Sequence, residues 1–398
     1  MHRNSLGRWL ERVGLVALLG AMGSMSGVVP ASAANPWTDP PPAALSPARG
    51  ALATATAPCP ATHRVLDCVY AVAGQIGDSP NISVVGTLQA YNWVSNTWTD
   101  LSPISPRREL AAAAAPCPLQ QGNGGNKTCV YAIGGRDAGG VVLNTLQSYD
   151  PANDSWTLRT VMPTARYFLA AAAAPCPSVA ARSGDWSGHT AETCIYAIGG
   201  KDANGSQLTA VEVYHPRTDT WSTAAGLPAA RDTLAAATAE CPSVQSRGDG
   251  QAHARKTCVY AIGGYNNGFK DTVESYDPTT DSWTTRPVMP TARNVLAAAA
   301  APCAPGPRAG GSTGTCIYAV GGANGGAGLQ TAESYNPATD SWTSLPNMPT
   351  GRGFLGASSA PCSFQHWGTC VYAVGGLETG FDTSSAVAAV ESLETRLL

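Results

Sequence analysis

Twelve cysteines carry the clearest chemical pattern in this sequence of 398 residues. They form six neighbouring pairs, one in each of six similar segments, and none is left over. In an exported protein this regularity predicts disulfide bonds. Metal binding is the alternative, but it needs closely spaced ligands, and the sequence has no C-x-x-C. The predicted disulfides are Cys59–Cys68, Cys117–Cys129, Cys176–Cys194, Cys241–Cys258, Cys303–Cys316 and Cys362–Cys370.

An arginine stands three residues before the first leucine of each segment. If the segments close into a ring, six guanidinium groups near a channel mouth would focus a positive field on an anionic ligand. The alternative is structural, with each arginine bonding carbonyl groups and tying adjacent repeats together. The residue after each arginine differs from repeat to repeat. Such variation is expected in a selective binding site, and equally in a loop that has no function. The six arginines are Arg49, Arg107, Arg166, Arg231, Arg293 and Arg352.

The elements that must position these residues repeat with a period of about 60 residues. In one copy Cys129 opens a strand that ends at Gly134-Gly135, and Tyr149 and Trp156 follow seven residues apart. Short strands and turn residues at this period predict a β-propeller blade with four strands, a to d. In that copy we expect strand a over 110–116, b over 129–133, c over 144–149 and d from 155. A single blade has two apolar faces, so the blades must stack.

Six blades are predicted, and the two ends of the chain should close the ring. The last repeat has strands a, b and c over 355–361, 370–374 and 387–393, but it lacks a tryptophan-bearing strand d. The N-terminal segment has the opposite excess, because Trp37 precedes the first strand a. We therefore predict an all-β fold, a six-bladed propeller of four antiparallel strands per blade, in which Trp37 completes the sixth blade.

The glycine pair, the tyrosine on strand c and the tryptophan seven residues later resemble the Kelch repeat. The first repeat departs from this pattern with Ala73-Gly74. The resemblance implies that the arginines tie blades together, because Kelch repeats commonly have arginine there. It also implies a second possibility, which is ligand binding by these arginines. Kelch adaptors that bind acidic peptides use arginines on the face of the ring that carries the d–a crossings and the b–c loops.

The b–c loops deliver further candidates for ligand binding to the same face. Loops on a rigid scaffold often carry function, although glycine and asparagine in them are also ordinary turn residues. A second surface is offered by the long a–b turns 178–193 and 243–257, with Trp186, Arg247, His253 and Arg255. The b–c loop candidates are Arg136, Asp137, Lys201, Asp202, Tyr265 and Asn266.

Catalytic patterns are mostly missing from the sequence. There is no H-E-x-x-H metal motif and no G-x-S-x-G elbow, so we expect no metal, no cofactor and no intrinsic catalysis. The copper oxidases related to galactose oxidase need histidines on the other face and an unpaired cysteine. One enzymatic alternative remains, because the chain resembles exported six-bladed Kelch mutarotases that act on sialic acid. Glu109 or Asp232 would then be the base.

The first 33 residues have the pattern of an export signal. A basic start is followed by an apolar run over 13–22 and by Ala31-Ser32-Ala33, a small-x-small cleavage site. A membrane anchor is the alternative, but the run is too short to span a bilayer. We expect residues 1–33 to be removed and 34–398 to form the propeller, secreted or periplasmic and not inserted in a membrane.

The charge of the chain limits the classes of partner that it is expected to bind. The net charge is −3, and lysines and arginines form no blocks. These properties argue against nucleic acid as a partner. The prediction is a binding protein that recognises a protein, peptide or glycan, including anionic ligands, through the face that bears the d–a crossings and b–c loops.

Overall fold

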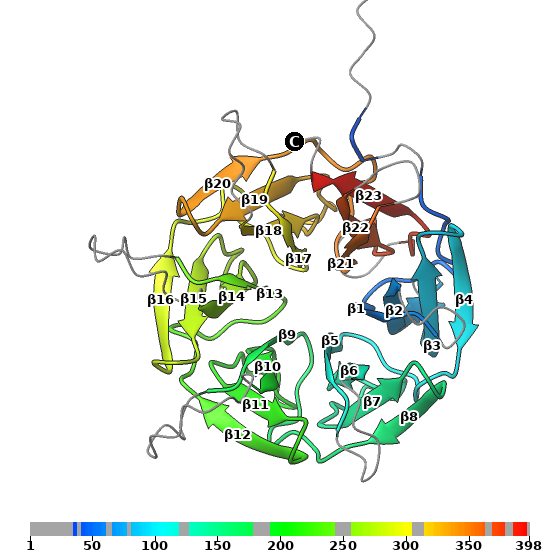
Figure 1. The fold of residues 1–398 in the computed structure, drawn as a ribbon, viewed down its shortest axis with the longest axis horizontal. Coiled ribbons are helices and arrows are strands. Elements are labelled where there is room, and N and C mark those ends of the chain that lie inside the picture. Colours follow the sequence, from blue (N-terminus) through cyan, green and yellow to red (C-terminus); the bar gives the residue numbers. More distant parts are fainter. Residues whose placement is uncertain are drawn as a thin grey trace, which may run out of the picture. The chain divides into compact units, whose positions relative to one another are not determined.

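Twenty-three β-strands build six antiparallel sheets in the computed structural model, and no α-helix occurs among the described residues (Figure 1). These sheets belong to the unit Asn35–Leu398. The first strand of each sheet contacts the first strand of the next, and β21 contacts β1, so the six blades form a closed ring. The described residues are 35–37, 41–60, 66–77, 81–118, 127–177, 192–242, 256–304, 314–362, 368–378 and 385–395. The predicted signal, residues 1–33, lies outside them.

The strands follow the predicted order a to d in each blade. The innermost strands a are β1 (Ala53–Pro58), β5 (Ala111–Pro116), β9 (Ala170–Pro175), β13 (Ala235–Glu240), β17 (Ala297–Pro302) and β21 (Gly356–Pro361). Strands b are β2 (Asp67–Ile76), β6 (Thr128–Ile133), β10 (Thr193–Ile198), β14 (Thr257–Ile262), β18 (Thr315–Val320) and β22 (Thr369–Val374). Strands c are β3 (Ser83–Asn92), β7 (Leu146–Asp150), β11 (Val211–His215), β15 (Val273–Asp277), β19 (Ala332–Asn336) and β23 (Val390–Glu394). Strands d are β4 (Thr97–Leu101), β8 (Ser155–Leu158), β12 (Thr220–Ala224), β16 (Ser282–Arg286) and β20 (Ser341–Ser344).

The alanine runs form strands although alanine favours helix in isolation. Buried and half-buried residues alternate along each strand a, as the two-residue period of a strand requires. The half-buried residues face a central channel where six strands converge, and only small side chains fit there. Tertiary crowding therefore overrides the helical propensity of the alanines.

Aromatic side chains fill the space between blades. Tyr131 of blade 2 packs against Tyr214 of blade 3, with ring centroids 5.8 Å apart, and Tyr214 lies 5.3 Å from Trp221 of its own blade. The Trp221 indole N–H donates to the carbonyl of Thr160 in blade 2 at 2.8 Å. These tryptophans therefore pack between neighbouring blades.

Trp37 closes the ring with the same kind of indole hydrogen bond. Its side chain is fully buried among residues of blades 5 and 6, and its indole N–H donates to the carbonyl of Pro346 at 2.7 Å. Within the described residues the sixth sheet has three strands, β21, β22 and β23. Trp37 takes the place of the missing strand-d tryptophan, as predicted.

The two positions of the glycine pair have different backbone requirements. Gly134 has φ of 61°, and Ala73 of the first blade has φ of 55° at the same place. Gly135 has φ of 94°, and a Cβ there would lie 2.7 Å from the Arg108 carbonyl oxygen. A Cβ at Gly134 would lie 2.5 Å from the Arg166 carbonyl oxygen, so both positions of this blade are too close to a neighbouring carbonyl for a side chain. Ala73 shows that the first blade accommodates alanine at the first position.

Candidate functional site

The six predicted disulfides are all present. Each joins the segment that follows strand a to strand b of the same blade, with Cα atoms 4.8–5.0 Å apart. Among the described residues no cysteine is free. Six disulfides indicate an oxidising environment for the protein. The a–b turns that they close define one side of the ring, which we call the disulfide face.

The six repeated arginines lie inside the blades. Their residues are 0–2% exposed, and each guanidinium group contacts a strand-c side chain of the blade that the arginine enters. Arg352, for example, donates to a carboxylate oxygen of Glu391 at 2.9 Å and to the Ala373 carbonyl at 3.1 Å. A ligand-binding role for these arginines stays a prediction. Their bonds to carbonyl groups match the structural alternative, but their guanidinium groups bond within one blade and do not tie adjacent blades together.

Each of the six arginines has a partner on strand c that the sequence prediction missed. In four blades the partner is a buried glutamate, and in blades 1 and 2 it is a glutamine. All six partners stand two residues before the aromatic or leucine residue near the end of strand c, a regularity that the sequence does contain. The partners are Gln89, Gln147, Glu212, Glu274, Glu333 and Glu391.

Burial separates the six guanidinium charges from the channel mouth, where the sequence predicted them. Desolvation lowers the pKa of Arg49, Arg107 and Arg293 to about 10, and it also lowers the pKa of Arg166 and Arg352. Four of the six guanidinium groups are also paired with carboxylates within their blades. These four pairings reduce the positive field that the arginines can project to the channel mouth.

A closed ring of backbone hydrogen bonds surrounds the channel mouth opposite the disulfide face. Six residues, one per blade, each donate an N–H to the carbonyl of the preceding blade at 2.9 Å. All six have left-handed backbones, with φ between 46° and 60°, a conformation that costs a non-glycine residue about 1 kcal/mol or more. The closed ring holds their side chains at the mouth. They are Ala51, Glu109, Phe168, Thr233, Val295 and Phe354.

Three aromatic and two charged side chains gather above this ring. Arg136 binds both carboxylate oxygens of Glu109, and its guanidinium carbon lies 4.4 Å from the centre of the Tyr167 ring. Tyr167 packs on Phe168, which meets Phe354 from the opposite blade with ring centroids 5.8 Å apart. Arg136 and the three aromatic residues are partly exposed. Together they present a rigid cation and apolar rings at the centre of the face.

A second group lies beside it, in blades 3 and 4. The Lys201 ammonium is 3.4 Å from the buried carboxylate of Asp232, which also accepts from the Gln207 amide at 2.9 Å. Tyr265 bridges to Asp232 through the backbone and packs edge-on against Phe269. The two groups place the predicted residues Arg136, Lys201 and Tyr265 on one surface. We call this surface, formed by the b–c loops and d–a crossings, the mouth face.

The other b–c loop candidates hold their own loops. The carboxylate of Asp137 accepts from the Val141 N–H at 2.8 Å, and that of Asp202 accepts from two backbone N–H groups of its turn. The Asn266 amide donates to the Ala230 carbonyl at 2.7 Å. Their ligand-binding role stays a prediction, and these contacts show a role in loop structure.

Neither carboxylate considered as a catalytic base contacts a repeated arginine in the described structure. Glu109 is paired with Arg136 and lies 3.6 Å from Arg108, whereas Asp232 is paired with Lys201. The sialic acid mutarotase alternative calls for a carboxylate within reach of two repeated arginines.

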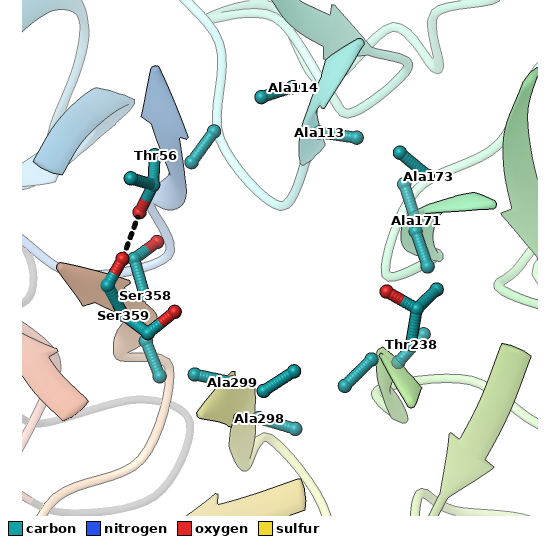
Figure 2. Close-up of a pocket in the computed structure, with 16 residues that line it drawn as sticks. Thr56, Ala113, Ala114, Ala171, Ala173, Thr238, Ala298, Ala299, Ser358 and Ser359 are labelled. Carbon is teal, nitrogen blue, oxygen red and sulfur yellow. Dashed lines mark hydrogen bonds between the residues drawn. The ribbon is translucent and has the colours of Figure 1, made fainter. Parts of the chain in front are cut away.

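The channel itself is lined by small side chains. Figure 2 shows alanines from all round the ring, with hydroxyl groups of Thr56, Thr238, Ser358 and Ser359 among them. The cavity has a volume of about 320 Å³. A smaller cavity of about 100 Å³ lies at the mouth between the leucine layer and the Phe168–Phe354 pair. None of the residues that line the 320 Å³ cavity is charged, whereas Glu109 is among those that line the smaller one.

Among the described residues, one group has ligand atoms close enough together to hold a metal ion. It consists of Cys176, Cys194 and His215. Both sulfur atoms are bonded to each other, so the group has no thiolate ligand to offer. The long-turn candidates Trp186, Arg247, His253 and Arg255 lie outside the described residues. None of the described residues forms a helix long and apolar enough to cross a membrane.

Comparison with known proteins gives a consistent family relationship. The Kelch motif family matches residues 124–162, 187–228, 247–290 and 306–349. The chain is 28% identical to Kelch-like protein 35 of Mus musculus over 163 residues, which cover 40% of this chain and 23% of that protein. It is 26% identical to Kelch-like protein terF of Aspergillus terreus over 299 residues, covering 68% and 52%. The chain thus spans about a quarter to a half of these relatives' length.

Proposed function

Since this chain belongs to the Kelch-repeat family, whose proteins act in protein interaction, we propose that it is a binding protein. The proposed protein is exported, and it recognises a protein, peptide or glycan through its mouth face. The observation that carries this proposal is the group of Arg136, Tyr167, Phe168 and Phe354 at the centre of that face. Arginine and large aromatic residues supply most of the affinity in protein interfaces.

The pre-arrangement of these side chains supports recognition. Glu109 and Tyr167 already hold the Arg136 guanidinium, and the backbone ring fixes Phe168 and Phe354, so little side-chain entropy is lost on binding. Across both groups, three cations, Arg108, Arg136 and Lys201, stand against the two carboxylates of Glu109 and Asp232. Asp137 and Asp202 add two carboxylates in the b–c loops of the same face, so the face presents charges of both signs to a partner.

Export is the second part of the proposal. The six disulfides and the signal pattern of residues 1–33 support a secreted or periplasmic protein. A protein with one disulfide per blade and a closed ring would tolerate conditions outside the cell. Its binding face is then available to partners there.

A ligand screen with matched variants tests the proposed face. Thermal-shift measurements on the purified protein would cover acidic peptides, sialic acid and neutral glycans, and a peptide array would extend them. For any ligand found, Arg136→Ala and Tyr167→Ala should each weaken binding by about tenfold or more. Arg217, 66% exposed in a c–d turn of the disulfide face, provides the control Arg217→Ala, which should bind normally.

The same screen distinguishes the buried repeated arginines from Arg136 of the mouth face. Arg166→Ala and Arg293→Ala should lower the melting temperature without a selective loss of ligand, because these side chains are buried within blades. Binding that survives Arg136→Ala and Tyr167→Ala, but disappears when a disulfide-face residue is changed, would contradict the proposed face.

A further inference from the structure

His215 interrupts a regular pattern at the end of strand c. In blades 1, 2, 4 and 5 this position is Asn92, Asp150, Asp277 or Asn336, and its side-chain oxygen accepts from the N–H two residues later at 2.8–2.9 Å. That contact holds the c–d turn. In blade 3 the histidine ring instead points to other partners.

Those partners are a disulfide sulfur and a hydroxyl group. His215 Nδ1 lies 3.1 Å from Cys194 Sγ, and its Nε2 lies 2.8 Å from Ser222 Oγ. Both contacts are satisfied when the Ser222 hydroxyl donates to Nε2 and Nδ1 carries the proton that faces sulfur. His215 is the one histidine among the described residues, and it lies against this disulfide.

We propose that Cys176–Cys194 is a thiol–disulfide exchange site that reacts readily with external thiols. A thiolate from a small thiol or dithiol attacks Sγ of Cys176, the partly exposed residue of the pair, whereas Cys194 is fully buried. A bond forms between the incoming sulfur and Cys176, the Cys176–Cys194 bond breaks, and its electron pair leaves on Cys194 Sγ.

His215 promotes this step by stabilising the leaving group. Its Nδ1–H donates to the new Cys194 thiolate, and a better-stabilised leaving thiolate departs faster. With a dithiol, the second thiol then attacks the mixed disulfide. The dithiol leaves as its own disulfide, having supplied two electrons, and the Cys176 thiolate takes a proton from water. Nearby, Glu192 and Arg217 form an ion pair at 3.8 Å, so the negative charge of one offsets the positive charge of the other.

Blade 4 offers a matched comparison within the same molecule. Cys241 and Cys258 are 17 residues apart, against 18 for Cys176 and Cys194, so loop length is nearly constant. At the position of His215 this blade has Asp277, whose carboxylate faces its own turn and Lys256. A carboxylate offers no N–H to a departing thiolate. The blade 4 disulfide should therefore exchange more slowly.

The test follows each disulfide in the folded full-length protein. Limiting dithiothreitol is added, samples are alkylated with isotopically distinct reagents over time, and each cysteine-containing peptide is quantified by mass spectrometry. Cys176 and Cys194 should be alkylated on the order of tenfold faster than Cys241 and Cys258. Glutathione, a monothiol, should give a mixed disulfide on Cys176.

Two substitutions assign the effect to the histidine. His215→Asn, which places in blade 3 the residue of blades 1 and 5, should remove the rate advantage while circular dichroism and melting temperature stay near wild type. Asp150→His should accelerate exchange at Cys117–Cys129. Equal rates for the blade 3 and blade 4 pairs in the wild-type protein, or an unchanged blade 3 rate in His215→Asn, would overturn the proposal. The mouth-face binding proposal is independent of either result.

Discussion

At the scale of single residues, the repeated arginine shows how a buried cation is accommodated. Arg231 lies against Glu274 and also donates to the Ala261 carbonyl, whereas Arg107 in blade 2 has the neutral Gln147 in the same place. The guanidinium group is therefore compatible with either an amide or a carboxylate. What the position requires is an acceptor, because an unpaired buried charge is costly.

This reasoning predicts an asymmetry between two substitutions in blade 4. Arg231→Ala should lower the free energy of unfolding by about 3–5 kcal/mol, because it leaves the Glu274 carboxylate buried without its cation. Glu274→Gln should cost much less, since it recreates the pair found in blades 1 and 2. Urea denaturation of both variants checks this, and equal losses would show that the charge itself is needed.

At the scale of the element, one indole hydrogen bond is repeated round the ring. Each strand-d tryptophan donates to a carbonyl of the preceding blade, and Trp37 makes the bond that joins the N-terminal segment to blade 5. Leu45 of the same segment bonds the Ala388 carbonyl in blade 6. The segment thus replaces a strand that the C-terminal repeat lacks.

Trp37→Ala should therefore open the molecule at blade 6. Removal of a fully buried tryptophan costs about 3–5 kcal/mol. The loss should also appear locally, as faster amide hydrogen exchange in β22 and β23. Trp156→Ala, which removes the same bond within a continuous blade, is the control and should speed exchange in blades 1 and 2 instead. Uniform exchange in both variants would argue against a special closing role.

At the scale of the whole molecule, the tyrosines between blades make stability sensitive to alkaline pH. Burial raises the pKa of eleven tyrosines above the ordinary value of 10, with Tyr91 and Tyr318 raised to about 12. In five blades the strand-c tyrosine also donates its hydroxyl to the aspartate or asparagine of the c–d turn. Ionisation would break these bonds.

The sign of the pH effect follows from the direction of these shifts. Because the folded pKa lies above the unfolded one, the stabilising contribution is complete below about pH 10 and declines as the pH rises above it. The melting temperature should fall between pH 10 and 12. Phenolate absorbance at 295 nm should rise together with loss of the circular dichroism signal. Most tyrosines ionising at pH 10 in a still folded protein would contradict this.

The repeat period, the cysteine pairs and the unmatched Trp37 were sufficient to predict the six blades, the six disulfides and the ring closure. These features are local, because each depends on residues close in sequence or on a pattern that recurs in register. The partners of the arginines were missed, although a glutamine or glutamate stands in every strand c. Nothing in a linear pattern tells whether a long cationic side chain points out to a ligand or back into its own blade.

By itself, the sequence determined the fold, the number of blades and the covalent links between strands. Only the tertiary structure decided which side chains meet. It brings Phe168 and Phe354 together from opposite blades, seats Arg136 between Glu109 and Tyr167, and turns His215 toward a disulfide. The physical reason is that such contacts join residues far apart in sequence, which are held on different strands or by different blades. Their positions depend on the closed ring rather than on local spacing.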